Sequence, residues 1–343
     1  MAKRILIYTN HYYPEQFKIN DLVRWLGEDL YKVRVITGLP NYPEGKIYKG
    51  FGIFSNLFKT PNSKNLIINR LFLIPRGNGS YPMLIINYLS YFISCLIFTV
   101  YIAIFKKKYD IIIVHHTSPF FVSIHPIVYS FFHKSKKILW ELDLWPETLR
   151  DINIIKSPIF FKKIEKIITK IYSYYDKILV SSYSFKKIVE KRFKGDVLYF
   201  PNWADSEIEN LEYISLNLKI PKDTFRIMYT GNIGTVQNFQ KLTDSIYDLR
   251  NNKIHWIFVG AGRFLNEFKK LTEKRNIQNY CTFIPRVKVN QIPSYARYAD
   301  CMYLSLNDSE IFKKTVPAKL QTYLALGKPI LAVISGEGAS IIT

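Results

Sequence analysis

The chain has 343 residues, 48% of them hydrophobic, and this length and apolar content predict two domains, each with its own core. Its three cysteines, Cys95, Cys281 and Cys301, stand far apart in apolar stretches, which excludes a disulfide framework and a zinc site and favours a reducing cytoplasm. The formal net charge of +21 fits nucleic acid, a phospholipid surface or a phosphorylated substrate as partner, but the abundance of Ile, Lys, Asn and Tyr fits a genome-wide composition bias equally well.

The N-terminal residues predict a strand and exclude a signal peptide, because the apolar run within Arg4–Thr9 is short and leads into polar residues. A helix over residues 19–30 and a strand over 32–37 follow, which is the βαβ rhythm of a parallel sheet. The turn at 10–17 has no glycine, so a dinucleotide fingerprint is excluded there. The turn-rich loop 38–46 then lies at the carboxyl end of its strand, where open α/β sheets bind ligands.

Residues 81–105 are apolar and aromatic, carry no charge and are followed by Lys106, Lys107 and Lys108. The length of this segment and the lysines that follow it are typical of a transmembrane helix. However, a buried strand is predicted at 110–116, and a spanning helix would divide one parallel sheet between two sides of a bilayer. We therefore predict a helix of the first domain that packs partly on the sheet and docks by its outer apolar face and its lysines on an anionic membrane surface. The alternative is a fully buried core helix.

The rest of the first domain continues the alternation of strands and helices. Further strands are predicted at residues 137–141, 177–181 and 198–201, and helices at 125–133, 159–175 and 184–193. Residues 202–223 lack clear periodicity and carry turn and cap residues, so a linker is predicted there, between a first domain at 1–201 and a second at 224–343.

The second domain restarts the same rhythm. Strands are predicted at 225–230, 255–259, 281–284, 299–306 and 330–334, and helices at 238–249, after the turn 260–263 as far as 274, at 292–298 and at 319–326. The fold class is therefore α/β, with two doubly wound domains. A doubly wound domain normally continues beyond a last strand such as 330–334, so the sequence predicts a C-terminally truncated second domain.

The stretch 315–330 is the strongest candidate for a binding element. It follows the buried strand 299–306 with a loop and a one-sided helix, which has Lys319 in its first turn and is stopped by Gly327 and Pro329. Free backbone N–H groups at such a helix start, together with the lysine, would receive a phosphate or diphosphate. The alternative is an ordinary strand and helix pair with a glycine stop.

Five motifs, in their order and spacing, resemble a known family over essentially the whole chain. They are Tyr13-Pro14-Glu15 with residues 19–22, the loop 40–45, the segment 143–147, the turn 229–234, and residues 316–319 with 326–329. The chain resembles bacterial nucleotide-sugar glycosyltransferases of family 4 (group 1), in the branch that builds O-antigen and capsule repeats and is typified by L-fucosamine transferases.

The resemblance implies a GT-B fold, in which two Rossmann-like domains face a cleft, with the acceptor on the first domain and the donor mainly on the second. It implies metal-independent transfer, with retention, of a hexosyl or N-acetylhexosaminyl group from a nucleoside diphosphate, UDP above all, to a polyprenyl-diphosphate-linked saccharide. No cofactor is expected beyond this nucleotide sugar, and no metal site. The expected location is the cytoplasm, peripheral (monotopic) at the inner face of the plasma membrane.

Two other functions also fit parts of the sequence. A nucleotide-sugar epimerase or hydrolase on the same fold would need neither a lipid acceptor nor a surface apolar helix. A basic nucleic-acid-binding protein is disfavoured because the cations are spread over many helices without a recognisable nucleic-acid module.

For the donor site, the resemblance implies that the turn from Gly231 through Asn232 to Gly234 passes close to the diphosphate, since glycine tolerates close approach. Lys319 and the backbone of Thr315, Val316 and Pro317 would neutralise it. The backbone at Arg286 and Val287 would contact the edge of the nucleotide base. Arg263 is a further candidate for the donor site, unless residues 260–262 are only the turn that ends a strand. Two features depart from the family: Lys313 and Gln321 replace its paired glutamates, so an amide would contact the ribose, and Thr235 stands near a usual lysine.

For the acceptor site, the family's catalytic histidine corresponds to either His115 or His116 at the end of the strand 110–116. Asp143 and Glu147 flank a rigid Trp-Pro pair, and either would orient or deprotonate an acceptor hydroxyl. Alternatively, Asp143 caps a following helix and Glu147 lies in its first turn. Glu15 and Asn20 are candidate contacts for the sugar or acceptor.

Overall fold

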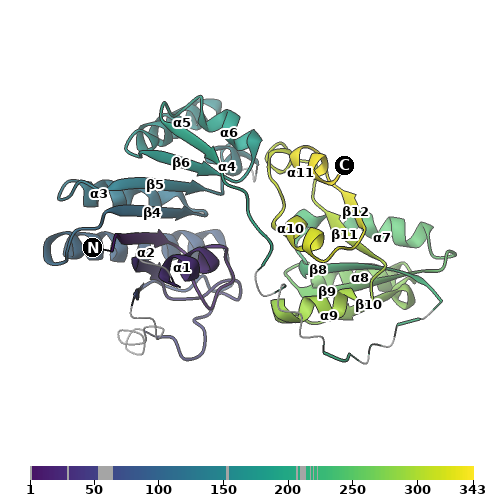
Figure 1. Ribbon diagram of the computed structural model, residues 1–343. Coiled ribbons are helices and arrows are strands. Elements are labelled where there is room, and N and C mark those ends of the chain that lie inside the picture. The colour runs from purple at the N-terminus through teal and green to yellow at the C-terminus, as the bar shows by residue number, and fades with distance from the viewer. Residues whose placement is uncertain are drawn as a thin grey trace. The chain divides into compact units, whose positions relative to one another are not determined.

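Two parallel β-sheets organise the chain (Figure 1), and the structure, a computed structural model, divides into a unit of residues 1–201 and a unit of residues 202–343. The structure describes residues 2–28, 31–52, 65–151, 154–205, 208, 214–216, 218, 220–221 and 223–343. Parts of two predicted segments lie outside the described residues: the end of the helix predicted at 19–30, and much of the linker predicted at 202–223.

The sheet of the first unit has seven parallel strands in the order β3-β2-β1-β4-β5-β6-β7. Their bounds are β1 Arg4–Thr9, β2 Lys32–Gly38, β3 Leu66–Leu71, β4 Ile111–His116, β5 Lys136–Glu141, β6 Lys177–Val180 and β7 Asp196–Tyr199. The central strands are buried along most of their length, as near-continuous apolar runs require when helices cover both faces of a sheet. The strand order reverses between β1 and β4, which is a topological switch point.

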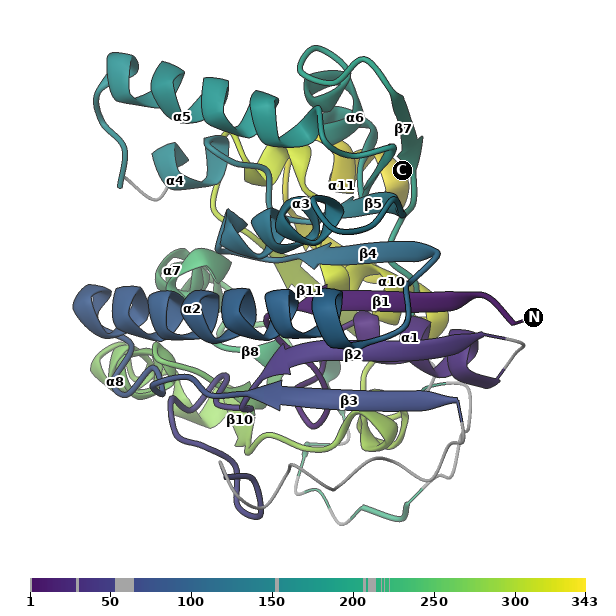
Figure 2. The ribbon, with the colours of Figure 1, turned by 90° about the vertical axis from the view of Figure 1, so that its left-hand side faces the viewer.

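Six α-helices of the first unit lie in the described residues. They are α1 Ile19–Glu28, α2 Tyr81–Phe105, α3 His125–Ser130, α4 Glu147–Asp151, α5 Pro158–Tyr172 and α6 Tyr183–Val189. Serines fix the starts of two of them, because Ser157 and Ser182 cap α5 and α6 by accepting a backbone hydrogen bond three residues further on. Figure 2 shows α2 and α3 on one face of the sheet and α1 on the other, as in a doubly wound unit.

The helix α2 has an unusual distribution of side chains. Its buried stripe includes polar groups: Tyr91 Oη donates to Thr9 O at 2.8 Å and Thr99 Oγ1 donates to Tyr8 Oη at 3.2 Å. Its outer stripe, spaced by four residues, is apolar and exposed and comprises Ile85, Leu89, Ile93, Ile97 and Tyr101. The helix is long and apolar enough to cross a membrane by length and composition, and only 28% of its most apolar window is buried. The fully buried core helix considered above is therefore wrong, whereas partial packing on the sheet is confirmed.

The sheet of the second unit has five parallel strands in the order β10-β9-β8-β11-β12. Its elements are β8 Phe225–Asn232, α7 Phe239–Asp248, β9 Ile254–Ala261, α8 Leu265–Lys274, β10 Cys281–Ile284, α9 Ile292–Ala296, β11 Cys301–Ser305, α10 Ala318–Ala325, β12 Ile330–Val333 and α11 Glu337–Ile342. The order again reverses next to the first strand of the unit, so that β8 and β11 form a second switch point.

Alternate residues of these strands enter two separate cores, as the period of two in a strand requires. Tyr229 and Phe258 pack with Phe239 and Phe268 on one side of the sheet. On the other side, the intervening strand residues pack against α10. Among them, Met228, Ile257 and Met302 share a core with Leu320 and Tyr323 of the helix.

Every element predicted above exists in the described residues, with ends that differ by a few residues. The prediction missed β3 and α11, and α4 was predicted only in the alternative interpretation of Asp143 and Glu147. The strand β3 lies at the edge of the sheet, and the half-buried Asn69 and Arg70 interrupt its apolar pattern. The helix α11 follows Gly336, which has a φ of 75° that favours glycine. In the sequence, a glycine at this position indicates a turn, so the helix after it was not predicted.

Candidate functional site

Polar residues gather at the carboxyl edge of the first sheet, at the switch point between β1 and β4. Thr9 ends β1 and lies opposite His115 in the register of the sheet. Their side chains meet, with Thr9 Oγ1 3.0 Å from His115 Nδ1. Ligands of open α/β sheets bind at this kind of position, so the predicted histidine lies where a site is expected.

The two histidines of β4 have different surroundings. His115 packs against Trp140 and Phe17, and burial, with the neighbouring His11 and His116, lowers the pKa of His115 to about 3. It is therefore a neutral imidazole at physiological pH.

His116 is fully buried on the opposite side of the strand, where its Nδ1 contacts Glu141 and its ring meets the edge of Phe120. Glu141 also accepts a hydrogen bond from Tyr172 Oη at 2.9 Å. Of the two histidines, His115 is thus the one that lies beside the polar cluster described below, whereas His116 belongs to a buried network under α5.

Asp143, just after β5, shapes the loop that follows β4. One of its carboxylate oxygens accepts from Ser118 N at 2.7 Å, and Ser118 Oγ accepts from Trp145 Nε1 at 2.9 Å. Asp143 therefore does not cap α4, which begins at Glu147. It lies half-buried and near enough to His11 to act on the pKa of that residue.

Glu147 lies in the first turn of α4, as the alternative prediction stated, and it is an ion-pair partner. Its carboxylate receives both terminal nitrogens of Arg192, one of which is 3.1 Å away, and Arg192 also contacts Glu165. The side chains of Glu147 and Arg192 are about one-tenth exposed (10% and 8%). Because both oxygens are engaged in this pair, Glu147 holds α4 against the segment that carries Arg192.

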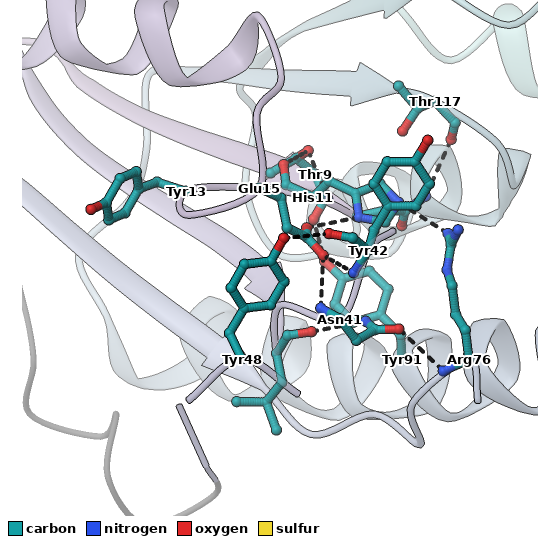
Figure 3. Close-up of polar contacts among 12 residues, drawn as sticks. Thr9, His11, Tyr13, Glu15, Asn41, Tyr42, Tyr48, Arg76, Tyr91 and Thr117 are labelled. Atoms are coloured by element: carbon teal, nitrogen blue, oxygen red, sulfur yellow. Dashed lines mark hydrogen bonds and ion pairs between the residues drawn. The ribbon is translucent and has the colours of Figure 1, made fainter. Parts of the chain in front are cut away.

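A network that the sequence did not predict joins β1, the loop after β2 and the loop after β3 (Figure 3). His11 Nδ1 is 2.8 Å from Glu15 Oε2, and His11 Nε2 is 3.1 Å from Arg76 Nη2. A guanidinium can only donate, so Nε2 is the acceptor and the proton of the neutral ring is on Nδ1, facing Glu15. Burial lowers the pKa of His11, and the nearby Glu15 and Asp143 carboxylates only partly oppose this.

Glu15 and Asn20, the predicted acceptor contacts, hold loops in place. Glu15 is buried, and its Oε1 accepts from Asn41 N at 2.8 Å and from Tyr42 N at 2.7 Å. Asn20 accepts from Tyr13 N at 2.9 Å and donates to Glu15 O at 2.7 Å. The sequence offered one signal for this network, since Asn41 and Tyr42 lie in the proline-rich loop at a strand's carboxyl end.

In the second unit, Lys319 lies against Gly231, near the end of β8. Gly231 has a φ of 117°, and a Cβ at this position would be 2.6 Å from Lys319 Cε. The positive φ favours glycine at this position, and a Cβ would also displace the end of the Lys319 side chain. Lys319 Nζ lies 4.2 Å from the centre of the Tyr229 ring and contacts Tyr229 Oη, while no ion pair of Lys319 is found in the described residues. Burial lowers the pKa of this lysine to about 7.

The turn after β8 is held by the neighbouring loop. Ile233 N donates to Ala261 O at 2.9 Å, and Phe264 N donates to Ile233 O at 3.1 Å. Gly234 N is bonded to Gln237 Oε1 at 2.9 Å. Of the residues predicted to line the diphosphate, Gly231 and Asn232 therefore lie beside Lys319 and Tyr229, whereas the Gly234 amide already has a partner.

The segment before α10 lies at the carboxyl ends of β11 and β12. A crevice too narrow for a water molecule lies there, lined by Leu306, Asn307, Phe312, Thr315, Pro317, Ile334 and Ser335. Thr315 N donates to Phe312 O at 3.2 Å and Leu320 N donates to Pro317 O at 2.9 Å, so these amides are engaged, whereas Ala318 N and Lys319 N at the start of α10 have no hydrogen-bond acceptor in the described residues. With the Gln321 amide assigned so that its nitrogen faces two carbonyl oxygens, it donates to Pro317 O and Ala318 O at 2.9 and 3.0 Å, which leaves its own carbonyl oxygen for other contacts.

The remaining predicted donor residues lie on the loops after β9 and β10. Arg263 and Arg286 are exposed and Val287 is half-buried. Because the strands are parallel, these loops lie at the same edge of the sheet as Gly231 and Lys319. Lys313, which stands where the resembled family has a glutamate, pairs with Asp308 and Glu310 at 3.4 and 3.1 Å. No group of three potential metal ligands occurs among the described residues.

Comparison with known proteins finds the same fold and one family model that matches most of the second unit. Residues 213–343 match the family model described as Glycosyl transferases group 1. The chain is 27% identical over 168 residues to the putative colanic acid biosynthesis glycosyl transferase WcaI of Escherichia coli, a match that covers 46% of this chain and 40% of WcaI. It is 22% identical over 315 residues to the probable glycosyltransferase WbjE of Pseudomonas aeruginosa, covering 87% of this chain and 76% of WbjE.

Among solved structures, HepE from Anabaena in complex with UDP and glucose aligns with a TM-score of 0.63 and 14% identity, covering 99% of this chain and 83% of HepE. This likeness, together with the two strand orders, confirms the predicted fold class of two parallel Rossmann-like sheets with GT-B proteins as structural neighbours.

Proposed function

Because residues 213–343 match the family model of the group 1 glycosyl transferases, we propose that this chain transfers a sugar from a nucleoside diphosphate, UDP above all, to a polyprenyl-diphosphate-linked saccharide in O-antigen or capsule synthesis. The observation that carries the proposal is Lys319, a lysine with a lowered pKa and no ion pair in the described residues, lying beside Gly231 at the switch point of the second sheet. The relatives support the process: WcaI is named for colanic acid biosynthesis, and HepE was solved with UDP.

In the proposed reaction, the bond between the sugar C1 and the diphosphate oxygen breaks while a bond from an acceptor hydroxyl oxygen to C1 forms. The leaving diphosphate gains negative charge, which protonated Lys319 and the first amides of α10 would stabilise without a metal ion. Because the new bond forms on the face that the diphosphate leaves, the anomeric configuration is retained, and the proton of the acceptor hydroxyl can pass to a departing phosphate oxygen. Arg286, Val287 and Gln321 would hold the nucleoside.

On the first unit, Asp143 is the candidate for orienting the acceptor hydroxyl, because one of its oxygens is held by Ser118 and the other has no hydrogen bond in the described residues. His115 would contribute as a neutral hydrogen-bonding group, since a pKa of about 3 keeps it from acting as an acid near pH 7.

We also propose that the protein is peripheral at the inner face of the plasma membrane, held there by the outer stripe of α2. The stripe is apolar and exposed, while the polar side chains of α2 face the protein, which is the reverse of a surface helix in water. Lys106, Lys107 and Lys108 follow it and would meet anionic lipid headgroups.

Vesicle flotation tests the membrane proposal. Anionic vesicles should recover the protein, and the pair Ile93→Asp and Ile97→Asp should abolish recovery, because each places a charge on the lipid-facing stripe. Leu249→Asp, at an exposed apolar residue of the second unit, is the matched control and should float like the wild type. Recovery of the double variant at the wild-type level would refute docking by α2, and equal recovery on neutral vesicles would remove the contribution of charge.

The donor class is tested by thermal unfolding with a panel of nucleotide sugars, because a ligand that binds only the folded state raises the midpoint. UDP and at least one UDP-sugar should raise it. No shift with any nucleotide or nucleotide sugar would refute the proposed function.

A further inference from the structure

Arg76 lies in the loop between β3 and α2, at the carboxyl edge of the first sheet. Its Nη2 donates to His11 Nε2 at 3.1 Å and faces Tyr88 Oη at 3.4 Å. No carboxylate forms an ion pair with it in the part of the chain that the structure describes. Among the described residues, Nε of Arg76 is buried without a hydrogen-bond partner, whereas Nη1, which also has none, is not fully buried. Arg76 is thus a half-buried guanidinium with donors to spare.

The guanidinium is held in place from several directions (Figure 3). Its backbone N donates to Asn41 Oδ1 at 3.2 Å, and its neighbour Gly77 donates from N to Gly45 O at 2.9 Å, which ties the loops after β2 and β3 together. The rings of Tyr42 and Tyr88 lie 5.1 and 5.4 Å from its central carbon. A cation fixed before its ligand arrives loses little side-chain entropy on binding.

The charge of Arg76 is not cancelled locally. The nearest carboxylate in the network, Glu15, is fully engaged by the Asn41 and Tyr42 amides and by His11. The neutral imidazole of His11 separates it from Arg76. A second guanidinium, Arg70 on β3, also lies near Glu15: its Nη2 donates to Tyr13 O at 2.6 Å, and its Nη1 is buried without a partner among the described residues. Partly desolvated cations without counter-ions are costly unless an anion joins them.

We propose that Arg76 binds a phosphate oxygen of the diphosphate that links the acceptor to its lipid, with His11 and Glu15 as positioning residues. The proposal rests on the proposed function, which places the acceptor on the first unit. The location fits a lipid-linked anion, because α2 begins at Tyr81, five residues after Arg76, and its exposed apolar stripe offers the attached hydrocarbon a surface. The planar guanidinium matches a phosphate in a bidentate manner that lysine does not reproduce.

Calorimetric titration of the full chain with inorganic pyrophosphate, in the presence of saturating UDP, tests the inference. UDP fills the donor site of the second unit, so the remaining pyrophosphate site is the one at Arg76. Arg76→Gln should weaken pyrophosphate binding roughly 10- to 100-fold, and Arg76→Lys should lie between Gln and wild type. Arg24→Gln, on the exposed side of α1, is the matched control and should bind like the wild type.

Two readouts keep the test decisive. The unfolding midpoint and the UDP affinity of Arg76→Gln should equal those of the wild type, and if this variant does not fold, Arg76→Lys carries the test. Unchanged pyrophosphate affinity in the folded variant would overturn the inference. Absence of UDP binding in the wild type would instead refute the donor proposal, so the two failures are distinguishable.

The source of the phosphate is decided by a second arm. Neutral vesicles with a few per cent polyprenyl diphosphate should retain the wild-type protein better than plain neutral vesicles, and Arg76→Gln should remove this difference. If pyrophosphate binds at Arg76 but the polyprenyl diphosphate adds nothing, the ligand is a free phosphate compound, and the lipid part of the inference is wrong.

Discussion

Replacing Lys319 by Met should expose the chemistry of the donor site. The substitution keeps the apolar stem against Gly231 and removes the ammonium next to Tyr229. A hydrogen bond between charged partners contributes about 1.5–3 kcal/mol, so the loss should weaken UDP binding by roughly 10- to 100-fold. Folding should not suffer, because the removed charge is partly desolvated and has no ion pair in the described residues. The unfolding midpoint should therefore stay the same or rise.

The pH dependence gives the sharper test. In the free protein, burial holds the pKa of Lys319 at about 7, below its ordinary value of 10.5. A diphosphate beside the ammonium favours the charged form and raises this pKa. At a pH between the pKa of Lys319 in the free protein and its pKa in the complex, the complex therefore holds more protons than the free protein. UDP affinity consequently falls as pH rises above about 7, by up to about tenfold per pH unit.

Calorimetry in buffers of different ionisation enthalpy measures both the affinity and the proton taken up. At pH 8, the wild type should take up a large fraction of one proton on binding UDP, and Lys319→Met should take up none. Lys274→Ala, at an exposed lysine of α8, should behave like the wild type. If Lys319→Met keeps both the affinity and the proton uptake, Lys319 does not contact the diphosphate and the reasoning fails.

Three further predictions concern neighbouring residues. Gly231→Ala should weaken UDP binding, because alanine is strained at a φ of 117° and its Cβ would displace the end of the Lys319 side chain, 2.6 Å away; calorimetry showing normal affinity would contradict this role of Gly231. Asp143→Asn should lower turnover at least tenfold while the affinity for UDP stays within twofold, and near-normal turnover would make Asp143 structural. Glu147→Gln should lower the free energy of unfolding by about 3 kcal/mol, because it leaves the buried Arg192 with a weaker partner, and a denaturant titration without a shift would argue against this ion pair.

The fold followed from the sequence because its signals are local. Apolar runs of strand length alternate with amphipathic helices, and a parallel order with both faces covered is what such alternation gives. The strand β3 was not predicted because an edge strand needs fewer apolar residues, and Asn69 and Arg70 interrupt its apolar pattern. The helix α11 was not predicted because Gly336, just before it, indicates a turn.

The candidate site was predictable in one respect only. The carboxyl ends of parallel strands share one edge of the sheet, so His115 and Asp143 in the first unit, and Gly231 and Lys319 in the second, could be placed at an edge from the sequence. Their partners could not, because the contacts join distant segments. His11 and Arg76 are 65 residues apart, and Glu147 and Arg192 are 45 apart. The sequence around one partner does not show which distant residue it contacts, or which carboxylate already forms an ion pair.

Gly231 illustrates a second limit. The sequence suggests that this glycine lets a diphosphate approach the backbone, whereas in the structure the space beside it is occupied by the Lys319 side chain. The residue was correctly placed, but its physical reason involves a contact with a residue 88 positions later in the chain (319 − 231).

The most direct test of the account is product analysis in the presence of EDTA, with UDP-sugars and a polyprenyl-diphosphate-linked monosaccharide as substrates. The product should be a lipid-linked saccharide longer by one sugar, formed with the donor's anomeric configuration retained and without a metal. Release of free sugar, or conversion of the UDP-sugar to its epimer, without any lengthening of the lipid-linked saccharide would contradict it and would favour a hydrolase or an epimerase.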